Sequence, residues 1–310
     1  MTNILKKLFR KSDHQADDSH PPEQTAQPSV LEDVTKPLEP MPGLSLPEQS
    51  KMTPPQLMAG CAQSVGRQRD HNEDALFTLT TTMANNSTNL AFGLYIVADG
   101  MGGHQHGEIA SETATRAMAE YIIRNLYTPL FSVTPQPLED SLQEIMQTGV
   151  QTAHEAITKS ITGGGTTLTS VLILGRQMII AHVGDSRVYA INPNGTMKSL
   201  TRDHSLVKRL EELGQLTAEE AAIHPQRNVL YRALGQGEPF EPEIIMEPPP
   251  SPGHILICSD GLWGLVSEIN MGDIIVNAET PQIACQELVA AANGAGGPDN
   301  ITAILIQIPG

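Results

Sequence analysis

The sequence lacks features that several classes of protein require. It has three cysteines, Cys61, Cys258 and Cys285, and none of them forms a CxxC pair. Neither a disulfide framework nor a zinc site is indicated, and a reducing compartment is expected. The longest apolar runs, such as residues 90–98, are too short to span a bilayer, and no secretory apolar core follows the basic start. These absences predict a cytoplasmic protein.

Basic residues are also scarce, since 19 Lys and Arg stand against 35 Asp and Glu, giving a formal net charge of −16. Binding to a phosphate backbone needs a basic footprint, so nucleic acid is not expected as a partner. An acidic surface suits an enzyme that binds cations, although it also serves solubility alone. We expect the protein to be a monomer.

Residues 1–58 differ in composition from the rest of the chain. They hold nine of the 23 prolines, and Phe9 is their one aromatic residue. Such a segment cannot bury a core, so we predict a disordered tail that is dispensable for folding, followed by one globular domain over residues 59–310. Within the tail, residues 1–11 place apolar side chains on one helical face and basic ones on the other. This pattern indicates either a weak membrane or partner contact, or only a solubilising start.

Hydrophobic periodicity predicts the elements of the globular part. Strands are expected at residues 76–80, 90–98, 168–174, 178–183, 187–191, 254–258 and 301–308, and helices at residues 108–127, 138–161, 205–213, 267–277 and 281–293. Thr217 to Glu220 resembles a capping box that opens another short helix. Strands come in runs with helices in pairs between them, which favours an α+β layered sandwich over alternating βαβ units.

Acidic residues gather at the ends of the predicted strands. The set comprises Asp99, Asp185 and Asp260 after three strands, Asp299 before the last strand, and Glu73 and Asp74 before the first. A single Asp at a strand end is often only a turn former. Six converging carboxylates, however, would repel one another unless cations neutralised them. Mg²⁺ and Mn²⁺ prefer such oxygen ligands, and two ions can share a bridging carboxylate and a bridging water.

The motifs around these acids resemble the type-2C, or metal-dependent, serine/threonine protein phosphatase family in its bacterial form. The matching segments, in family order, are GRQRDHNEDAL (66–76), VADGMGGHQHGEIAS (97–111), GGTTLTSVLI (164–173), HVGDSRVYAI (182–191), LTRDHS (200–205), HPQRNVLYRALG (224–235), LICSDGLWGLV (256–266) and GGPDNITAILI (296–306). They cover residues 60–308, and chance agreement of so many motifs is negligible. The resemblance implies a four-layer α-β-β-α sandwich with two central antiparallel sheets flanked by helices.

The resemblance also implies a set of site residues. The metal ligands would be Glu73, Asp74, Asp99, Gly100, Asp185, Asp260 and Asp299, and the catalytic residues would be Arg69, Asp99 and Asp260. Mn²⁺ or Mg²⁺ would bind at two tight sites and a third weaker one. Asp99 would bridge the first two metals, with Asp260 and Asp299 completing the first site.

The remaining implied roles concern the second and third metals and the substrate. The Gly100 carbonyl and Glu73, directly or through water, would serve the second metal, and Asp74 would orient metal-bound water. Asp185, together with Asp260, would hold the third metal. Arg69 would grip the substrate phosphate, because a guanidinium matches phosphate oxygens. Asn300 would support Asp299 and the local turn.

The activity implied is hydrolysis of phosphoserine and phosphothreonine monoesters by a metal-bridging hydroxide. Phosphoproteins made by a serine/threonine kinase are the expected partners. Met101 follows the Asp-Gly pair where eukaryotic relatives carry a histidine proposed as general acid, and the nearby His104 does not occupy that position. Residues 201–235 correspond to the flap of bacterial relatives and are expected to select the substrate.

Several alternative functions compete with this interpretation. The loop from Asp99 to residue 103 lacks the spacing and lysine of a nucleotide-binding loop, and Ser186 lacks a nucleophile elbow. His104 and His106 alone do not make a zinc site. A pseudophosphatase that only binds phosphoproteins should have lost ligands, yet every expected acid is present. A phosphatase of small phosphate esters would use the same chemistry and stays open.

Overall fold

The computed structural model describes residues 56–84, 89–102, 105–135, 137–160, 163–237 and 240–310. The amphipathic pattern of residues 1–11, nearly all of the predicted tail, and His104 lie outside the described residues. None of the helices in the described ranges is long and apolar enough to cross a membrane.

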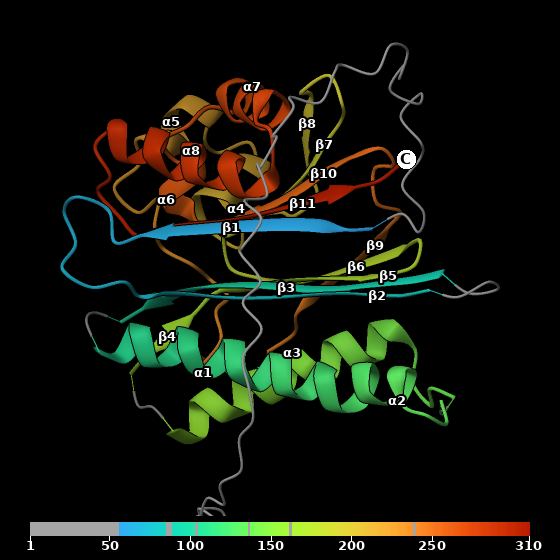
Figure 1. Ribbon diagram of the computed structural model, residues 1–310. Helices are drawn as coiled ribbons and strands as arrows, with labels where there is room; N and C mark the ends of the chain where they lie inside the picture. Colours follow the sequence, from blue (N-terminus) through green and yellow to red (C-terminus); the bar gives the residue numbers. More distant parts are fainter. Residues whose placement is uncertain (1–55, 85–88, 103–104, 136, 161–162, 238–239) are drawn as a thin grey trace, which may run out of the picture. The chain divides into compact units, whose positions relative to one another are not determined.

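Two antiparallel sheets form the centre of the domain (Figure 1). In the first sheet the strand order is β1 (Met58–Ser64), β11 (Ile301–Ile308), β10 (Gly253–Cys258), β7 (Arg187–Ile191) and β8 (Met197–Ser199). In the second the order is β2 (Asp74–Ala84), β3 (Asn89–Met101), β5 (Leu168–Leu174), β6 (Gln177–Val183) and β9 (Glu243–Glu247), and β4 (Gly165–Thr166) pairs with the end of β3.

Helices cover the outer face of each sheet, which completes the four layers (Figure 1). The second sheet is covered by α1 (Gln105–Ile122) and α3 (Leu142–Ser160), with η1 (Ile123–Tyr127) and α2 (Thr128–Phe131) continuing from α1. The first sheet is covered by α6 (Asp260–Trp263), α7 (Glu268–Asn277) and α8 (Pro281–Gly294). The segment 201–235 carries α4 (Leu206–Glu212) and α5 (Ala218–Ala222). The predicted α+β sandwich is confirmed.

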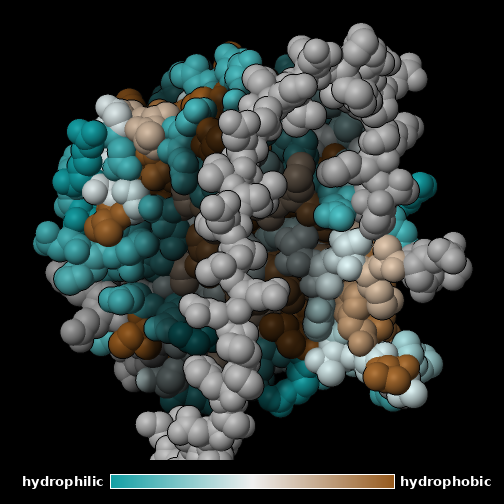
Figure 2. All heavy atoms as spheres, in the orientation of Figure 1, coloured by the Kyte–Doolittle hydropathy of each residue, from teal (hydrophilic) through white to brown (hydrophobic). Residues whose placement is uncertain are grey.

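Strand alternation divides the core into three layers of buried side chains. On β3, Leu94 and Ile96 pack under α1 and α3, whereas Tyr95 and Val97 face the other sheet. Strands buried on both faces need apolar residues at nearly every position, which explains the long apolar runs. Figure 2 shows apolar atoms in the band where the sheets stack, and a mostly hydrophilic surface at the left end, where the strand-end loops of Figure 1 lie.

The structure corrects the predicted helix boundaries at two places. The regular helix expected to reach residue 127 ends at Ile122 and continues as a π-turn, in which the Thr128 N–H bonds the Ile123 carbonyl next to Pro129. Proline lacks an N–H, which disturbs the regular ladder of the preceding turn. The next helix begins at Leu142 rather than residue 138, because Ser141 and Glu144 exchange the bonds of a capping box.

The antiparallel topology brings the predicted acidic positions to one end of the sandwich. Strands β3, β6 and β10 end there, and β2 and β11 begin there, on the left in Figure 1. In the β2–β3 register Asp74 lies directly opposite Asp99. The sheet therefore sets two carboxylates side by side before any loop contributes.

Deletion of residues 1–55 is expected to leave the fold intact, because that segment is too polar and proline-rich to add to the core. The cut belongs before Leu57, which is buried, and before β1, which begins at Met58. A chain beginning at Gln56 should unfold cooperatively within about 0.5 kcal/mol of the full chain in a urea titration. A chain beginning at Gly66 should fail to fold, because it lacks the strand that pairs with β11. Equal stability of both truncated chains would contradict this assignment.

Candidate metal centre

Asp74 is held by the hydroxyl groups of Ser259, which follows β10, and of Thr302 in β11. Its Oδ2 accepts hydrogen bonds from Ser259 Oγ at 2.9 Å and from Thr302 Oγ1 at 2.6 Å. Its Oδ1 is buried and has no hydrogen-bond partner. A buried carboxylate oxygen without a partner carries a desolvation penalty, so a further polar or cationic group is needed to satisfy it.

Asp99 is positioned through its main chain. Its N–H donates to Thr167 Oγ1 at 2.9 Å, and its carbonyl accepts from the Thr167 N–H at 2.8 Å and from Thr166 Oγ1 at 2.9 Å. These bonds extend β3 beyond the predicted strand end and leave the Asp99 carboxyl group free for other contacts. The Thr166-Thr167 pair is thus a support for Asp99 that the sequence-based prediction missed.

Glu73 and Gly100 meet the start of α1 through close backbone contacts. The Gly100 N–H donates to the Glu73 carbonyl at 3.1 Å. A side chain at Gly100 would overlap the carbonyls of Gly107 and Glu73, and one at Gly107 would lie 2.8 Å from Glu73 Oε2. Gly100 therefore requires glycine, whereas a side chain at position 107 would displace the Glu73 carboxylate. Gly107 was missed because a single glycine near a helix start carries no signal for a site.

Asn300 ties the loop before β2 to the loop before β11. Its Oδ1 accepts from the Glu73 N–H at 2.8 Å, and its Nδ2 donates to the carbonyls of Val65 and His71 at 2.9 and 2.8 Å. Its own N–H donates to Asp299 Oδ1 at 2.8 Å. Asn300 therefore orders both acid-bearing loops, a wider role than support of Asp299 alone.

Arg69 and Asp260 complete this end of the sandwich. Arg69 Nη2 lies 2.9 Å from Asp299 Oδ2, and both side chains are partly exposed. Asp260 is the first residue of α6, and its carboxyl group interacts electrostatically with that of Asp99. Asp185 is buried in the turn between β6 and β7. All seven predicted ligands and Arg69 thus come to one end of the domain.

Burial and mutual repulsion dominate the electrostatics of the cluster. Burial raises the pKa of Asp74 to about 7, and burial followed by the charge of Asp299 raises the pKa of Asp260 to about 6. Burial and the charges of neighbouring aspartates also raise the pKa of Asp99 and of Asp185 well above the usual range. Ionising the whole cluster near neutral pH therefore requires added positive charge.

The donor set fits hard divalent cations. The groups are carboxylate and carbonyl oxygens, with the unpartnered Asp74 Oδ1 beside them. Across the described ranges, no three His, Cys, Asp or Glu side chains are arranged as the ligands of a single ion. Mg²⁺ in proteins commonly keeps several of its waters, so a carboxylate can serve it through a bound water as well as directly.

Two of the alternative interpretations conflict with the geometry. The main-chain N–H groups of Asp99 and Gly100 already donate to Thr167 Oγ1 and to the Glu73 carbonyl, so they are not available to cradle a nucleotide phosphate. Ser186 is fully buried, with its Oγ 3.0 Å from Thr167 Oγ1, which suits a structural turn residue rather than a nucleophile. The zinc alternative involves His104, which lies outside the described residues.

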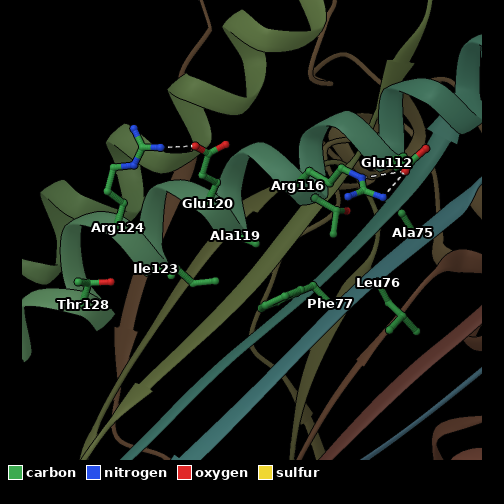
Figure 3. A pocket seen from close by; sticks show the side chains of 11 residues that line it. Ala75, Leu76, Phe77, Glu112, Arg116, Ala119, Glu120, Ile123, Arg124 and Thr128 are labelled. Atoms are coloured by element: carbon green, nitrogen blue, oxygen red, sulfur yellow. Dashed lines mark hydrogen bonds and ion pairs between the residues drawn. The ribbon is translucent and has the colours of Figure 1, made fainter. Parts of the chain in front are cut away.

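A groove of about 850 Å³ lies apart from the acidic end, between α1 and the edge strand β2 (Figure 3). Leu76, Phe77 and Ile123 line it, and Glu112–Arg116 is one of two ion pairs along its rim. None of the predicted ligands is among its lining residues.

A family model described as protein phosphatase 2C matches residues 59–301. The chain belongs to this family. It is 36% identical over 242 residues to the serine/threonine phosphatase stp of Listeria welshimeri, covering 78% of this chain and 92% of the relative. The S. agalactiae serine/threonine phosphatase structure matches with a TM-score of 0.67 and 32% identity, covering 81% of this chain and 99% of that one. The resemblance found in the motifs is confirmed.

One similar solved structure contains metal ions. The catalytic domain of the serine/threonine protein phosphatase PstP, solved in complex with two manganese ions, shares 29% identity and a TM-score of 0.65. The match covers 82% of this chain and 99% of that chain.

Proposed function

We propose that this chain is a serine/threonine protein phosphatase that hydrolyses phosphoserine and phosphothreonine monoesters with Mn²⁺ or Mg²⁺. The observation that carries the proposal is the convergence of Asp74, Asp99, Asp185, Asp260 and Asp299 at one end of the sandwich, where burial raises the pKa of Asp74, Asp99, Asp185 and Asp260. Membership of the protein phosphatase 2C family supports it. The presence of the complete acid set argues against a pseudophosphatase.

We assign the ligands as the motifs imply. Asp99 would serve the first and second cations, Asp260 and Asp299 would complete the first site, and Glu73, directly or through water, would serve the second together with the Gly100 carbonyl. Bound cations neutralise phosphoryl oxygens and activate a water near neutral pH. Asp74, fixed by two hydroxyl groups, orients the water shell through its remaining oxygen.

Arg69 is assigned to the substrate phosphate. Its guanidinium already lies at the rim of the cluster, half-exposed, where it contacts Asp299. A guanidinium with one bonded nitrogen keeps further N–H groups for phosphate oxygens. Met101, paired with Gly165 in the β3–β4 ladder, carries no titratable group to protonate the leaving oxygen. That proton must come from elsewhere in the hydrated site.

The segment 201–235 is assigned to protein recognition. Several of its large apolar side chains are exposed, namely Leu213, Ile223, Val229 and Tyr231. Exposed apolar residues concentrated on one segment suit a macromolecular partner better than a small ester. We therefore favour phosphoproteins produced by a serine/threonine kinase as substrates.

We further propose that residues 56–310 form the catalytic domain of a monomer that works in the cytoplasm, with residues 1–55 as a separate tail. The buried Leu57 and the start of β1 at Met58 move this boundary from the predicted residue 59 toward the N-terminus. The three cysteines are free thiols, and Cys258 and Cys285 are buried. Thiols that remain unpaired are typical of a reducing compartment, which supports that location.

The proposal is tested by phosphate release from phosphothreonine peptides and from a chromogenic aryl phosphate, with Mn²⁺ or Mg²⁺ added to the full chain. Cation-dependent turnover of both is expected, with the higher kcat/KM for peptides. Turnover of the aryl phosphate and small metabolite esters, with no hydrolysis of any phosphopeptide, would favour the small-ester alternative. Stoichiometric phosphopeptide binding without turnover would instead favour a pseudophosphatase.

Replacing Arg69 by alanine is expected to raise KM for phosphate esters about 10- to 100-fold with a smaller effect on cation affinity. A charge-assisted hydrogen bond to phosphate contributes about 1.5–3 kcal/mol. Steady-state kinetics and calorimetric cation titration on one preparation separate the two effects. Arg67→Ala is the matched control, because Arg67 is exposed and precedes the acidic loop. If only cation affinity falls, Arg69 acts by orienting Asp299.

A further inference from the structure

Trp263, the single tryptophan of the chain, joins the turn that carries Asp185 to the helix that begins at Asp260. Its indole N–H donates to the Asp185 carbonyl at 3.0 Å. The guanidinium of Arg187 lies 3.5 Å from the centroid of the indole ring, a cation–π contact. The indole therefore fixes the turn on either side of Ser186.

Arg187 carries this contact into the segment 201–235. Its Nε and Nη2 donate to the two carboxylate oxygens of Asp203 at 2.9 and 2.7 Å, and its Nη1 donates to the Tyr189 hydroxyl at 3.1 Å. Asp203 is buried. A two-point bond from a rigid fork sets both the distance and the plane of the pair, so Asp203 and Arg187 move together.

His204 closes the same turn from its other side. Its N–H donates to the Gly184 carbonyl at 2.8 Å, and its Nδ1 accepts from the Gly184 N–H at 3.1 Å. Gly184 has a φ of +113°, and a side chain there would overlap Thr167. The turn from Gly184 to Arg187 thus has no room to shift unless the first residues of the segment 201–235 shift with it.

We propose that Trp263, Arg187 and Asp203 form a clamp that couples the position of the segment 201–235 to the position of the Asp185 carboxyl group. In this arrangement Trp263 and Asp203 are positioning residues for a weakly bound third cation. The inference rests on the proposed function, in which Asp185 is the ligand unique to that cation. Because coupling is reciprocal, a partner that holds the segment 201–235 in its clamped position also tightens the third site.

The single tryptophan supplies a direct test on the full chain. Its fluorescence should change during a Mg²⁺ titration at the concentration that fills the weak site, since the indole bonds the Asp185 carbonyl. The matched variant Asp185→Ala should lose this high-concentration phase and keep tight binding by calorimetry. The same phase in Asp185→Ala, or calorimetric filling of the weak site with no change in emission, would overturn the clamp.

A second test removes the link to the segment 201–235. Asp203→Asn should raise the Mg²⁺ concentration for half-filling of the weak site at least tenfold, leave the tight sites within twofold, and regain turnover at saturating Mg²⁺. Asp140→Asn, an exposed position before α3, is the control and should change none of these. Trp263→Phe keeps a ring face but no N–H, and calorimetry should show the same weakening if Asp203→Asn does not fold.

The outcomes separate this inference from the proposed function. Unchanged weak-site affinity in folded Asp203→Asn and Trp263→Phe would refute the clamp even if the wild-type chain hydrolyses phosphopeptides. Failure of the wild-type chain to hydrolyse any phosphate ester would refute the function, whereas the Mg²⁺-dependent emission would still report whether Trp263 is coupled to Asp185.

Discussion

Exhaustive treatment with EDTA is expected to abolish phosphate release and to lower the melting temperature, with the larger drop at pH 7.5 than at pH 5. Activity should fall to background, because within the described residues the proposed mechanism has no protein nucleophile to replace an activated water. Each cation at a hundredfold excess over its Kd adds about 2.7 kcal/mol of stability, provided that it does not bind the unfolded chain. For a domain of this size that corresponds to roughly 2–4 °C per kcal/mol.

The pH dependence follows from the raised pKa values. Burial raises the pKa of Asp74 to about 7, whereas an unfolded aspartate has a pKa of about 3.9. Between these values the folded chain binds more protons than the unfolded chain, so its stability falls as the pH rises from about 4 to about 7. A divalent cation replaces those protons, and its stabilising effect is therefore larger at the higher pH.

The measurement is a set of thermal melts at both pH values with EDTA or with excess Mg²⁺, paired with assays of the same samples. Sodium chloride at matched ionic strength is the control, because it screens charge without occupying the site. Readdition of Mg²⁺ should restore both phosphate release and the melting temperature. Full activity after EDTA, or a stabilisation by Mg²⁺ that is larger at pH 5, would contradict the assigned centre.

Much of the fold was predictable because its strands are buried on both faces. The predicted bounds of β5, β7 and β11 agree with the structure, since runs of Val, Ile and Leu mark such strands clearly. The strands β1, β8 and β9 were missed. The sequence of β1 is made mostly of small residues, and β9 lies between proline-rich stretches. The local β-propensity of both segments is therefore weak, and they form strands because they pair with a neighbouring strand.

The acidic positions were also predictable, because each lies next to glycine at a strand end. The residues that hold them were harder to find. Thr167 and Ser259 lie next to predicted strands and Thr302 lies within one, and nothing in their local sequence indicates that their hydroxyl groups support Asp99 and Asp74. Their contacts join positions far apart in the chain, and a single sequence gives no local sign of such pairs.

The contacts around Asp185 could not be predicted for the same reason, because they join residues far apart in the chain. The motif GDSR indicates an acid in a turn, but the link from Arg187 to Asp203 and Trp263 appears only when three separate segments meet. Asp203 and Trp263 both lie in sequence motifs that this chain shares with the phosphatase family. Their proximity could be read only from the structure.

Replacing Asp99 by asparagine is expected to reduce kcat at least about 10³-fold and to stabilise the cation-free chain. The change is nearly isosteric, and the hydrogen bonds that hold Asp99 in place involve its main chain and Thr166 and Thr167. The loss of a ligand shared by two cations removes electrostatic stabilisation of the transition state, and 10³-fold corresponds to about 4 kcal/mol.

The gain in stability has the same origin as the loss of activity. Burial and the charges of Asp74 and Asp260 raise the pKa of Asp99 well above its usual range, so ionised Asp99 destabilises the cation-free fold. An amide carries no charge. Thermal melts in EDTA at pH 7.5 should therefore give a higher melting temperature for Asp99→Asn than for the wild-type chain. Asp140→Asn, at an exposed position, is the control and should leave the melting temperature unchanged. In excess Mg²⁺ the order should reverse, because the wild-type chain gains more binding energy. Retention of turnover within tenfold, or a lower melting temperature in EDTA, would show that Asp99 serves the fold rather than the cations.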